Sequence, residues 1–297
     1  MINIKKQYDF RLYMTIVLLL FNFSTFGQQK EIAVSHKFCG LKVKNKRVLD
    51  SRIPEGSGLV AWNGKLWTHN DSGRPALFCL DTIDYKIIKE YNLGVPNIDW
   101  EEISQDDNYL YMGNFGNNLG KRNKLPIYRI SKEALLQNKI VLDSITFEWP
   151  EKINYDCEAM VPTHDSIFLF TKEWKGHRCQ IFKIPAQPSH HIAEYVATLK
   201  NRTLITGASY RAEDNRILLI GYSRFLSPRI LMLSLSENKN MDIRKVKLIR
   251  INQNFRQTEG IASFNGTDYF IISEGTDLHL WKTKPKLYKV KIPLSDK

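Results

Sequence analysis

Residues 158–170 read EAMVPTHDSIFLF, and residues 259–272 read EGIASFNGTDYFII. In both stretches an acidic and a small residue precede an apolar run, a polar turn follows, and an aromatic-rich run then begins. Short apolar runs that are bounded by turn residues and rich in aromatic and β-branched residues indicate β-strands. The same pattern occurs five times, and the predicted first strands begin near Ser57, Glu101, Glu158, Thr206 and Glu259.

The repeat extends to a third strand in every unit and to a fourth strand in four units, most clearly at Ser144–Trp149 and Lys245–Arg250. Units of about 45–55 residues with four short antiparallel strands are typical of β-propeller blades. We therefore predict an all-β protein, a β-propeller of four-stranded antiparallel blades, with five blades by repeat count and six as the alternative. Because the last unit ends after its third strand, we expect the N-terminal segment Gly40–Lys44 to close the ring, which removes two open sheet edges.

The first residues have a different character. Lys5, Lys6 and Arg11 precede an apolar run from Leu12 to Phe26, and Gly27 follows. This order of basic, apolar and small residues is typical of a secretory signal peptide. A membrane anchor is the alternative, but the run is shorter than the ~20 apolar residues of a membrane span. We predict a signal peptide at 1–27, a single β-propeller domain at 28–297, and a secreted or periplasmic mature chain without a transmembrane segment.

The chain of 297 residues carries a formal net charge of +12. Removal of the signal peptide would leave about +10, which suits an anionic small molecule, an acidic glycan or another envelope component. Scattered lysines that only solubilise the surface explain the charge equally well. Nucleic acid is not expected because no nucleic-acid motif is present, and we expect a monomer. The four cysteines lack zinc spacing, so we expect buried thiols with at most one disulfide.

The repeat also predicts where polar side chains gather. In an up-and-down blade the start of the first strand and the end of the second lie on one face, because antiparallel neighbours reverse direction. Propeller symmetry should therefore bring Glu101, Glu158 and Glu259 to one mouth of the channel. Converging carboxylates raise one another's pKa or require a cation, and their oxygens suit Ca²⁺ or another divalent cation. The alternative is a ring of structural hydrogen bonds, in which Glu side chains cap backbone N–H groups between blades.

The predicted ends of the second strands are polar as well, and they should lie at the same mouth. Cationic side chains there could pair with the acids or hold an anionic ligand. The ligand-binding candidates are Asn70, Asp71, Arg74, Lys172, Arg224 and Glu274. No complete catalytic constellation can be named, and the catalytic candidates are Glu101, Glu158, Glu259 and Lys172.

Four strings carry a resemblance: NDSG at 70–73, DWEE at 99–102, GNFGNN at 113–118 and EAM at 158–160. On these residues the chain resembles secreted bacterial β-propeller proteins, which are distantly similar to the SMP-30/gluconolactonase-like, esterase-like phytase and SdiA-regulated propellers. The resemblance spans roughly Ser57 to Val290. It implies a propeller fold, and lactonases of this type hold a divalent cation at the channel mouth with Glu, Asn and Asp. The matching metal ligands here would be Glu101, Glu158, Asn114 and Glu259.

Two functions follow from these expectations. The first is an exported propeller that binds a ligand at the acidic channel mouth, as a binding or scaffold protein of the cell envelope. The alternative is a divalent-metal-dependent hydrolase of a lactone, ester or phosphoester, in which the cation activates a water molecule and one Glu acts as general base. No organic cofactor is expected in either case.

Overall fold

The computed structural model describes residues 30–174, 176, 178–236, 242–277 and 282–293. The chain divides into two units, 1–31 and 32–297, and the second unit is described here by itself. The predicted signal peptide at 1–27 lies outside the described residues. Within those residues, no helix has the length and hydropathy needed to cross a membrane.

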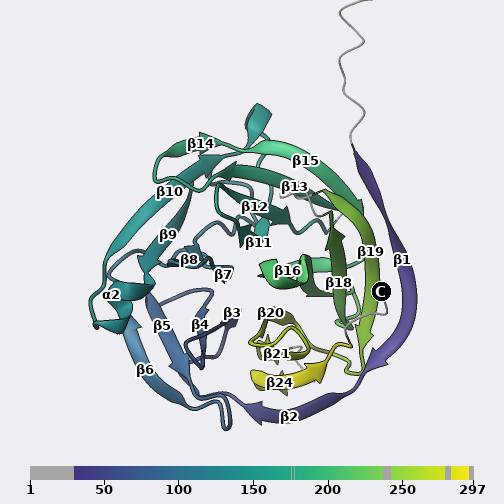
Figure 1. Ribbon diagram of the computed structural model, residues 1–297, viewed down its shortest axis with the longest axis horizontal. Helices are drawn as coiled ribbons and strands as arrows, with labels where there is room; N and C mark the ends of the chain where they lie inside the picture. The colour runs from purple at the N-terminus through teal and green to yellow at the C-terminus, as the bar shows by residue number, and fades with distance from the viewer. Residues whose placement is uncertain (1–29, 175, 177, 237–241, 278–281, 294–297) are drawn as a thin grey trace, which may run out of the picture. The chain divides into compact units, whose positions relative to one another are not determined.

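The described residues form five four-stranded antiparallel blades, as the repeat count predicts (Figure 1). Blade 1 contains β3 (Gly56–Trp62), β4 (Lys65–Asn70), β5 (Ala76–Leu80) and β6 (Ile87–Asn92). Blade 2 contains β7 (Glu102–Gln105), β8 (Tyr109–Gly113), β9 (Leu125–Ser131) and β10 (Leu142–Glu148). Blade 3 contains β11 (Cys157–Pro162), β12 (Ser166–Thr171), β13 (Arg178–Pro185) and β15 (Glu194–Lys200). Blade 4 contains β16 (Leu204–Arg211), β17 (Arg216–Tyr222), β18 (Pro228–Leu235) and β19 (Ile243–Ile251). Blade 5 contains β20 (Thr258–Ser263), β21 (Asp268–Ser273), β24 (Lys286–Lys291) and β2 (Val43–Val48).

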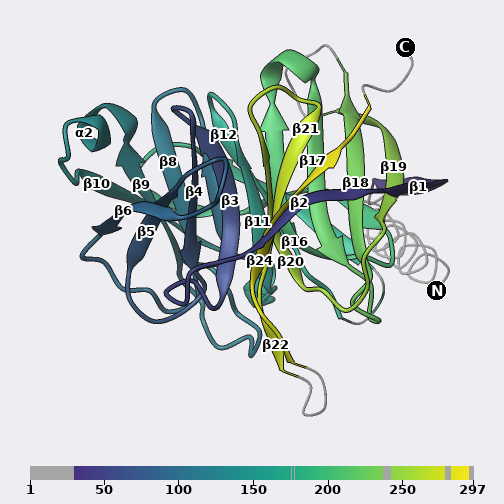
Figure 2. The ribbon, with the colours of Figure 1, turned by 90° about the horizontal axis from the view of Figure 1, so that it is seen from below.

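Several short elements lie outside the four-stranded blades. The helix α2 (Lys132–Leu136) follows β9, and β14 (His190–Ile192) pairs with the outer strand of blade 2. Single 3₁₀ turns occupy Pro150–Lys152 and Ala212–Asp214. The hairpin of β22 (Thr276–Asp277) and β23 (Lys282–Thr283) projects where β21 ends and β24 begins (Figure 2).

The inner strands β3, β7, β11, β16 and β20 surround the axis, and each contacts the next one around the ring (Figure 1). Their close approach explains the small residue in the repeat. A Cβ on Gly260 would lie 2.6 Å from the carbonyl carbon of Gly58, so the inner strands of blades 5 and 1 can approach this closely only at glycine. In blade 2 the same repeat position holds Glu102, whose side chain is described below.

The hydrophobic core is divided among the five interfaces between blades. Each of the five buried clusters draws its residues mainly from two neighbouring blades. Aromatic residues fill these interfaces, for example Phe170 between blades 3 and 4 and Phe270 between blades 5 and 1. Packing of each blade against two neighbours explains why the sequence repeats an aromatic second strand.

The N-terminal segment closes the ring, as predicted, because β2 pairs antiparallel with β24 and supplies the fourth strand of blade 5. The segment also contributes a second strand, whose position the repeat did not predict. The preceding strand β1 (Glu31–Leu41) pairs in parallel with β19 and lies beside β15, so blades 3 and 4 merge into one nine-stranded sheet. Three cysteines whose side chains are described, Cys79, Cys157 and Cys179, are buried free thiols, as expected.

Candidate functional site

A cavity of about 180 Å³ opens at the mouth predicted from the repeat. Its lining is almost entirely polar and comes from blades 1, 2, 3 and 5 and the loops beside them. We call this site the acidic mouth, and its lining residues are Ser57, Asp71, Asp99, Glu101, Asn118, Glu158, Lys172, Gln257, Glu259 and Glu274.

The three glutamates of the repeat converge there, as predicted. Glu101, Glu158 and Glu259 all line the cavity, with exposed fractions of 7%, 1% and 6%. Their backbones are held where inner strands begin: the Glu101 N–H donates to the Gly113 carbonyl at 3.0 Å, and the Ser57 hydroxyl donates to the Glu101 carbonyl at 2.6 Å. Symmetry of the blades thus places three buried carboxyl groups around one axis.

Lys172 supplies a positive charge within this cluster. Its Nζ lies 2.9 Å from Glu158 Oε1, and the lysine side chain is only 10% exposed. Burial works to lower the pKa of Lys172, but the neighbouring Glu158, Glu259 and Glu101 raise it well above its ordinary value. The ammonium group therefore stays charged and occupies part of the space in which a metal ion would be expected.

The acids at the mouth and directly beside it occur in neighbouring pairs, and each pair belongs to one blade or to the loops that flank it. The pairs are Glu55 with Asp71, Asp99 with Glu101, Asp156 with Glu158, and Glu259 with Glu274. Both carboxyl groups of the pair Asp99–Glu101 lie close to the backbone of Gly116, within the GNFGNN segment. A Cβ atom added to Gly116 would lie 2.4 Å from Asp99 Oδ2 and 2.4 Å from Glu101 Oε1. Glycine at that position leaves room for both carboxyl groups.

Burial and like charge make these carboxyl groups hold protons. Burial, together with Glu55, raises the pKa of Asp71 to about 8. Burial also raises the pKa of Asp156, beside Glu158, to about 8 and that of Glu274 to about 7. For Glu101 and Glu259 burial raises the pKa well above the usual range of a carboxyl group, and neighbouring carboxylates add to the effect. Near neutral pH the mouth therefore carries fewer negative charges than its composition suggests.

Glu102, another glutamate of the repeated motifs, makes a structural hydrogen bond between blades and does not line the cavity. It is fully buried, and its Oε2 accepts a hydrogen bond of 2.6 Å from the Ala208 N–H. The bond runs from β7 of blade 2 to β16 of blade 4, across the ring. The alternative of Glu side chains that cap N–H groups between blades therefore describes Glu102, which was not among the predicted site residues.

Several predicted residues do not line the cavity. Asn114, a predicted metal ligand, is fully buried: its Oδ1 accepts the Asp99 N–H at 3.1 Å, and its Nδ2 donates to the Pro96 carbonyl at 3.0 Å. Asn70 is similarly engaged, with its Nδ2 donating to the Arg52 carbonyl at 2.8 Å.

The two predicted arginines also lie away from the mouth. Arg74 is exposed and pairs with Glu90, and Arg224 donates to the Trp174 carbonyl. Of the cations proposed to hold an anionic ligand, Lys172 is the one that lines the cavity.

The mouth contains residues that the sequence did not single out as ligands. Asp99, Ser57, Asn118 and Gln257 line it, and the Gln257 side chain donates to Glu274. Ser57 and Asp99 lie within or beside the repeated motifs, so their position in the repeat was an available signal. Gln257 precedes its blade by one residue, and nothing in its sequence surroundings marked it.

The oxygen atoms at the mouth meet only part of the requirements of a divalent cation. Glu101, Glu158 and Glu259 provide suitable oxygens, but Lys172 bonds to one of them and Asn114 is bonded elsewhere. Among the described residues, no group of three or more His, Cys, Asp or Glu side chains is arranged to hold a metal ion. The predicted four-ligand site therefore does not fit the arrangement of these side chains.

Comparison with known proteins adds little beyond this geometry. No family model matches the chain, and no curated protein matches it, so the resemblance to secreted bacterial propellers stays a prediction. A chain of the mitotic checkpoint complex is 13% identical, with a TM-score of 0.38, and the match covers 79% of this chain and 60% of that one. A candidate 6-phosphogluconolactonase from Bacteroides uniformis ATCC 8492 is 14% identical, with a TM-score of 0.37 and coverage of 80% and 72%. The U3-55K structure is 9% identical, with a TM-score of 0.41 and coverage of 80% and 68%. Similarity at this level carries no functional argument.

Proposed function

We propose that this protein is a ligand-binding propeller whose acidic mouth captures a small organic cation, such as an amine or a guanidinium compound. The observation that carries the proposal is Glu259. Its carboxyl group borders the cavity, its residue is 6% exposed, and it forms no hydrogen bond in the described part of the chain. Its carboxyl oxygens are not among the enclosed atoms without a partner, so they are open to the cavity, where a cationic ligand could donate hydrogen bonds to them.

The charges at the mouth favour a cation over the anionic small molecule expected from the sequence. Six acidic residues line the cavity with a single lysine, and that lysine is bonded to Glu158. The two arginines expected to hold an anion lie elsewhere. An ammonium or guanidinium group could instead displace protons from Glu259 and Glu274, whose pKa values are raised chiefly by burial.

The size of the cavity suits a small ligand. Its volume of about 180 Å³ is close to the ~150 Å³ of a cavity that admits benzene. A ligand of one ring or one short chain would fill it. If the chain is exported as the sequence predicts, the ligand would come from outside the cytoplasm.

The metal-dependent hydrolase is the alternative, and the arrangement of side chains supports it less well. The buried carboxyl groups favour it, since they are hard oxygen donors. The Lys172–Glu158 bond and the engaged amide of Asn114 argue against it. A binding role needs no reactive group, and it is therefore the simpler explanation of the site.

Calorimetric titration of the full chain with putrescine, arginine methyl ester and Ca²⁺ tests the proposal. We expect an amine to bind and to release protons, which gives heats that depend on the ionisation enthalpy of the buffer. Glu259→Gln should weaken binding about tenfold, since it removes a charge-assisted hydrogen bond.

The matched control is Glu194→Gln, which removes an exposed carboxylate paired with Lys183 at 3.2 Å. That variant should bind the amine like the wild type. Saturable binding of Ca²⁺ without binding of either amine would favour the hydrolase alternative. No binding by any of the three probes would refute a cation site at the mouth.

A further inference from the structure

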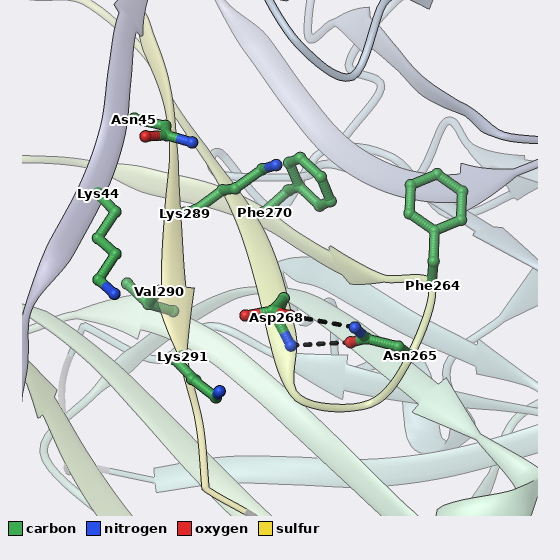
Figure 3. Close-up of a pocket in the computed structure, with 9 residues that line it drawn as sticks. All are labelled: Lys44, Asn45, Phe264, Asn265, Asp268, Phe270, Lys289, Val290 and Lys291. Carbon is green, nitrogen blue, oxygen red and sulfur yellow. Dashed lines mark hydrogen bonds between the residues drawn. The ribbon is translucent and has the colours of Figure 1, made fainter.

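A second cavity, larger than the acidic mouth, lies on the blade that closes the ring. Its volume is about 390 Å³, and strands β2, β21 and β24 contribute its lining with the loop before β21 (Figure 3). We call it the closure pocket. Its lining residues are Lys44, Asn45, Phe264, Asn265, Asp268, Phe270, Lys289, Val290 and Lys291.

Strand register explains why its charged side chains lie together. Lys44 on β2 is directly opposite Lys289 on β24, and Lys289 is directly opposite Phe270 on β21. Directly opposite residues of antiparallel strands point to the same face of a sheet. Lys291, two residues beyond Lys289, points to that face as well. Three lysines and one aromatic ring therefore share one face of blade 5.

An anion would lower the repulsion among these lysines, of which Lys44 and Lys291 are exposed and Lys289 is half-buried. Like charges directly opposite each other on paired strands destabilise a sheet. In the described part of the chain, Lys44, Lys289 and Lys291 form no ion pair. Asp268 is the one carboxylate of the lining, and its Oδ2 accepts a hydrogen bond from Asn265 Nδ2 at 3.1 Å instead. The Lys289 ammonium lies 4.5 Å from the centre of the Phe270 ring (Figure 3).

The pocket also has an exposed apolar wall. Phe264 is 39% exposed and meets Phe270 edge-on, with ring centres 5.9 Å apart. Asn45, Asn265 and Asp268 add polar groups to the lining. A mainly apolar cavity with a few polar groups, in the range of ~300–1,000 Å³, is typical of a small-molecule site.

We propose that the closure pocket binds a sugar acid, either as a free sugar or as one unit of an acidic glycan. The carboxylate would lie among Lys44, Lys289 and Lys291 and relieve their repulsion. The apolar face of the sugar ring would pack against Phe264, and its hydroxyl groups would meet the asparagines and Asp268. The site is separate from the acidic mouth and does not depend on the function proposed there.

Titration of the full chain with glucuronate, polygalacturonate, neutral dextran and single-stranded oligodeoxythymidylate tests the inference. We expect both uronates to bind and the other two probes not to bind. Binding of glucuronate and polygalacturonate with equal affinity per site identifies a single-sugar pocket, whereas tighter binding of the polymer identifies a glycan surface; both outcomes support the proposal.

Variants separate this pocket from the general basic charge of the protein. Lys289→Met should weaken uronate binding about tenfold, since it removes one charge-assisted contact. Phe264→Ala, which changes no charge, should also weaken it. Lys245→Met, on an exposed position of β19, and Glu259→Gln at the acidic mouth should leave it unchanged.

Three results would overturn the proposal: equal losses with Lys245→Met and Lys289→Met, equal binding of oligodeoxythymidylate, or no binding of either uronate. The substituted lysine and phenylalanine are not among the buried residues, so loss of folding is not expected, and thermal melts of each variant verify that point.

Discussion

At the scale of single residues, the acidic mouth is defined by carboxyl groups that lie in neighbouring pairs, most of them buried or half-buried. Asp71, Asp156 and Glu274 illustrate the effect, since burial raises their pKa values to about 8, about 8 and about 7. Such groups bind protons in the folded state that they release when the chain unfolds. The mouth therefore links folding stability to pH.

We expect the protein to lose stability as the pH rises from about 4 to about 8. In this range the folded carboxyl groups hold protons that the unfolded chain, with ordinary pKa values near 4, has lost. The free energy of unfolding must then fall with rising pH. Asp71→Asn and Glu274→Gln should flatten this dependence, because an amide cannot titrate. Thermal melts near pH 5 and pH 8 measure it, and the exposed Asp165→Asn is the control. Parallel pH profiles for all four proteins would contradict the prediction.

Lys172 should contribute strongly to stability at neutral pH. Lys172→Met keeps much of the side-chain volume but leaves Glu158 and its neighbours without their cation, which should cost about 3 kcal/mol. Urea unfolding measures the loss.

The comparison is Lys183→Met, which removes the exposed pair with Glu194 and should cost less than about 1 kcal/mol. Similar losses for the two variants would show that the buried pair has no special role. The cost of Lys172→Met should also fall at acid pH, where the carboxyl groups are neutral.

At the scale of elements, the N-terminal segment contributes to the fold in two separate ways. Strand β2 completes blade 5 through its pairing with β24, and β1 joins the outer strands of blades 3 and 4. Both pairings cover sheet edges, which would otherwise present unpaired backbone groups to other chains.

Two truncations of a chain that begins at residue 28 separate these contributions. Deletion of residues 28–41 removes β1 and should lower the melting temperature while one cooperative transition remains. Deletion of residues 28–48 also removes β2, opens the ring, and should cause aggregation or loss of cooperative unfolding. Calorimetry and light scattering distinguish these outcomes. A 28–48 deletion that melts like the chain of residues 28–297 would show that β2 does not close the ring in solution.

At the scale of the whole molecule, blades that are far apart in sequence meet around the axis. The hydrogen bond from the Ala208 N–H to Glu102 joins blades 2 and 4 directly. A buried carboxyl group in this position braces the ring, because it satisfies an N–H group of an opposite inner strand.

Glu102→Ala should destabilise the protein by about 1–3 kcal/mol, because the Ala208 N–H is then buried without a partner. Glu102→Gln should cost much less. Its amide oxygen can accept the same hydrogen bond, and burial raises the pKa of Glu102 well above its ordinary value, so the loss of the carboxyl charge should matter little. Chemical denaturation of both variants measures the difference. Equal losses would argue that volume or another contact of Glu102, rather than the hydrogen bond, stabilises the ring.

The predicted export concerns the whole chain as well. We expect residues 1–27 to be removed in the native host, which intact-mass spectrometry of the purified protein would detect. An N-terminus at Met1 in a membrane fraction would instead identify the segment as an anchor.

The sequence by itself was enough to predict the five blades, their strands, the closing strand and the convergence of Glu101, Glu158 and Glu259. These features follow from local patterns: alternation of strands and turns, and a repeat whose symmetry maps equivalent positions onto one ring. The period of the repeat carries the information, and no long-range contact has to be known to use it.

Tertiary structure decided what each side chain at the mouth contacts. The bond between Lys172 and Glu158, the engagement of Asn114 with Pro96 and Asp99, and the reach of Glu102 to Ala208 depend on side-chain directions across blades. The course of β1 beside blades 3 and 4 likewise belongs to no repeat. The sequence determines at which end of a strand a residue lies. The packing of neighbouring blades determines whether its side chain points into the cavity, into the core or across the axis.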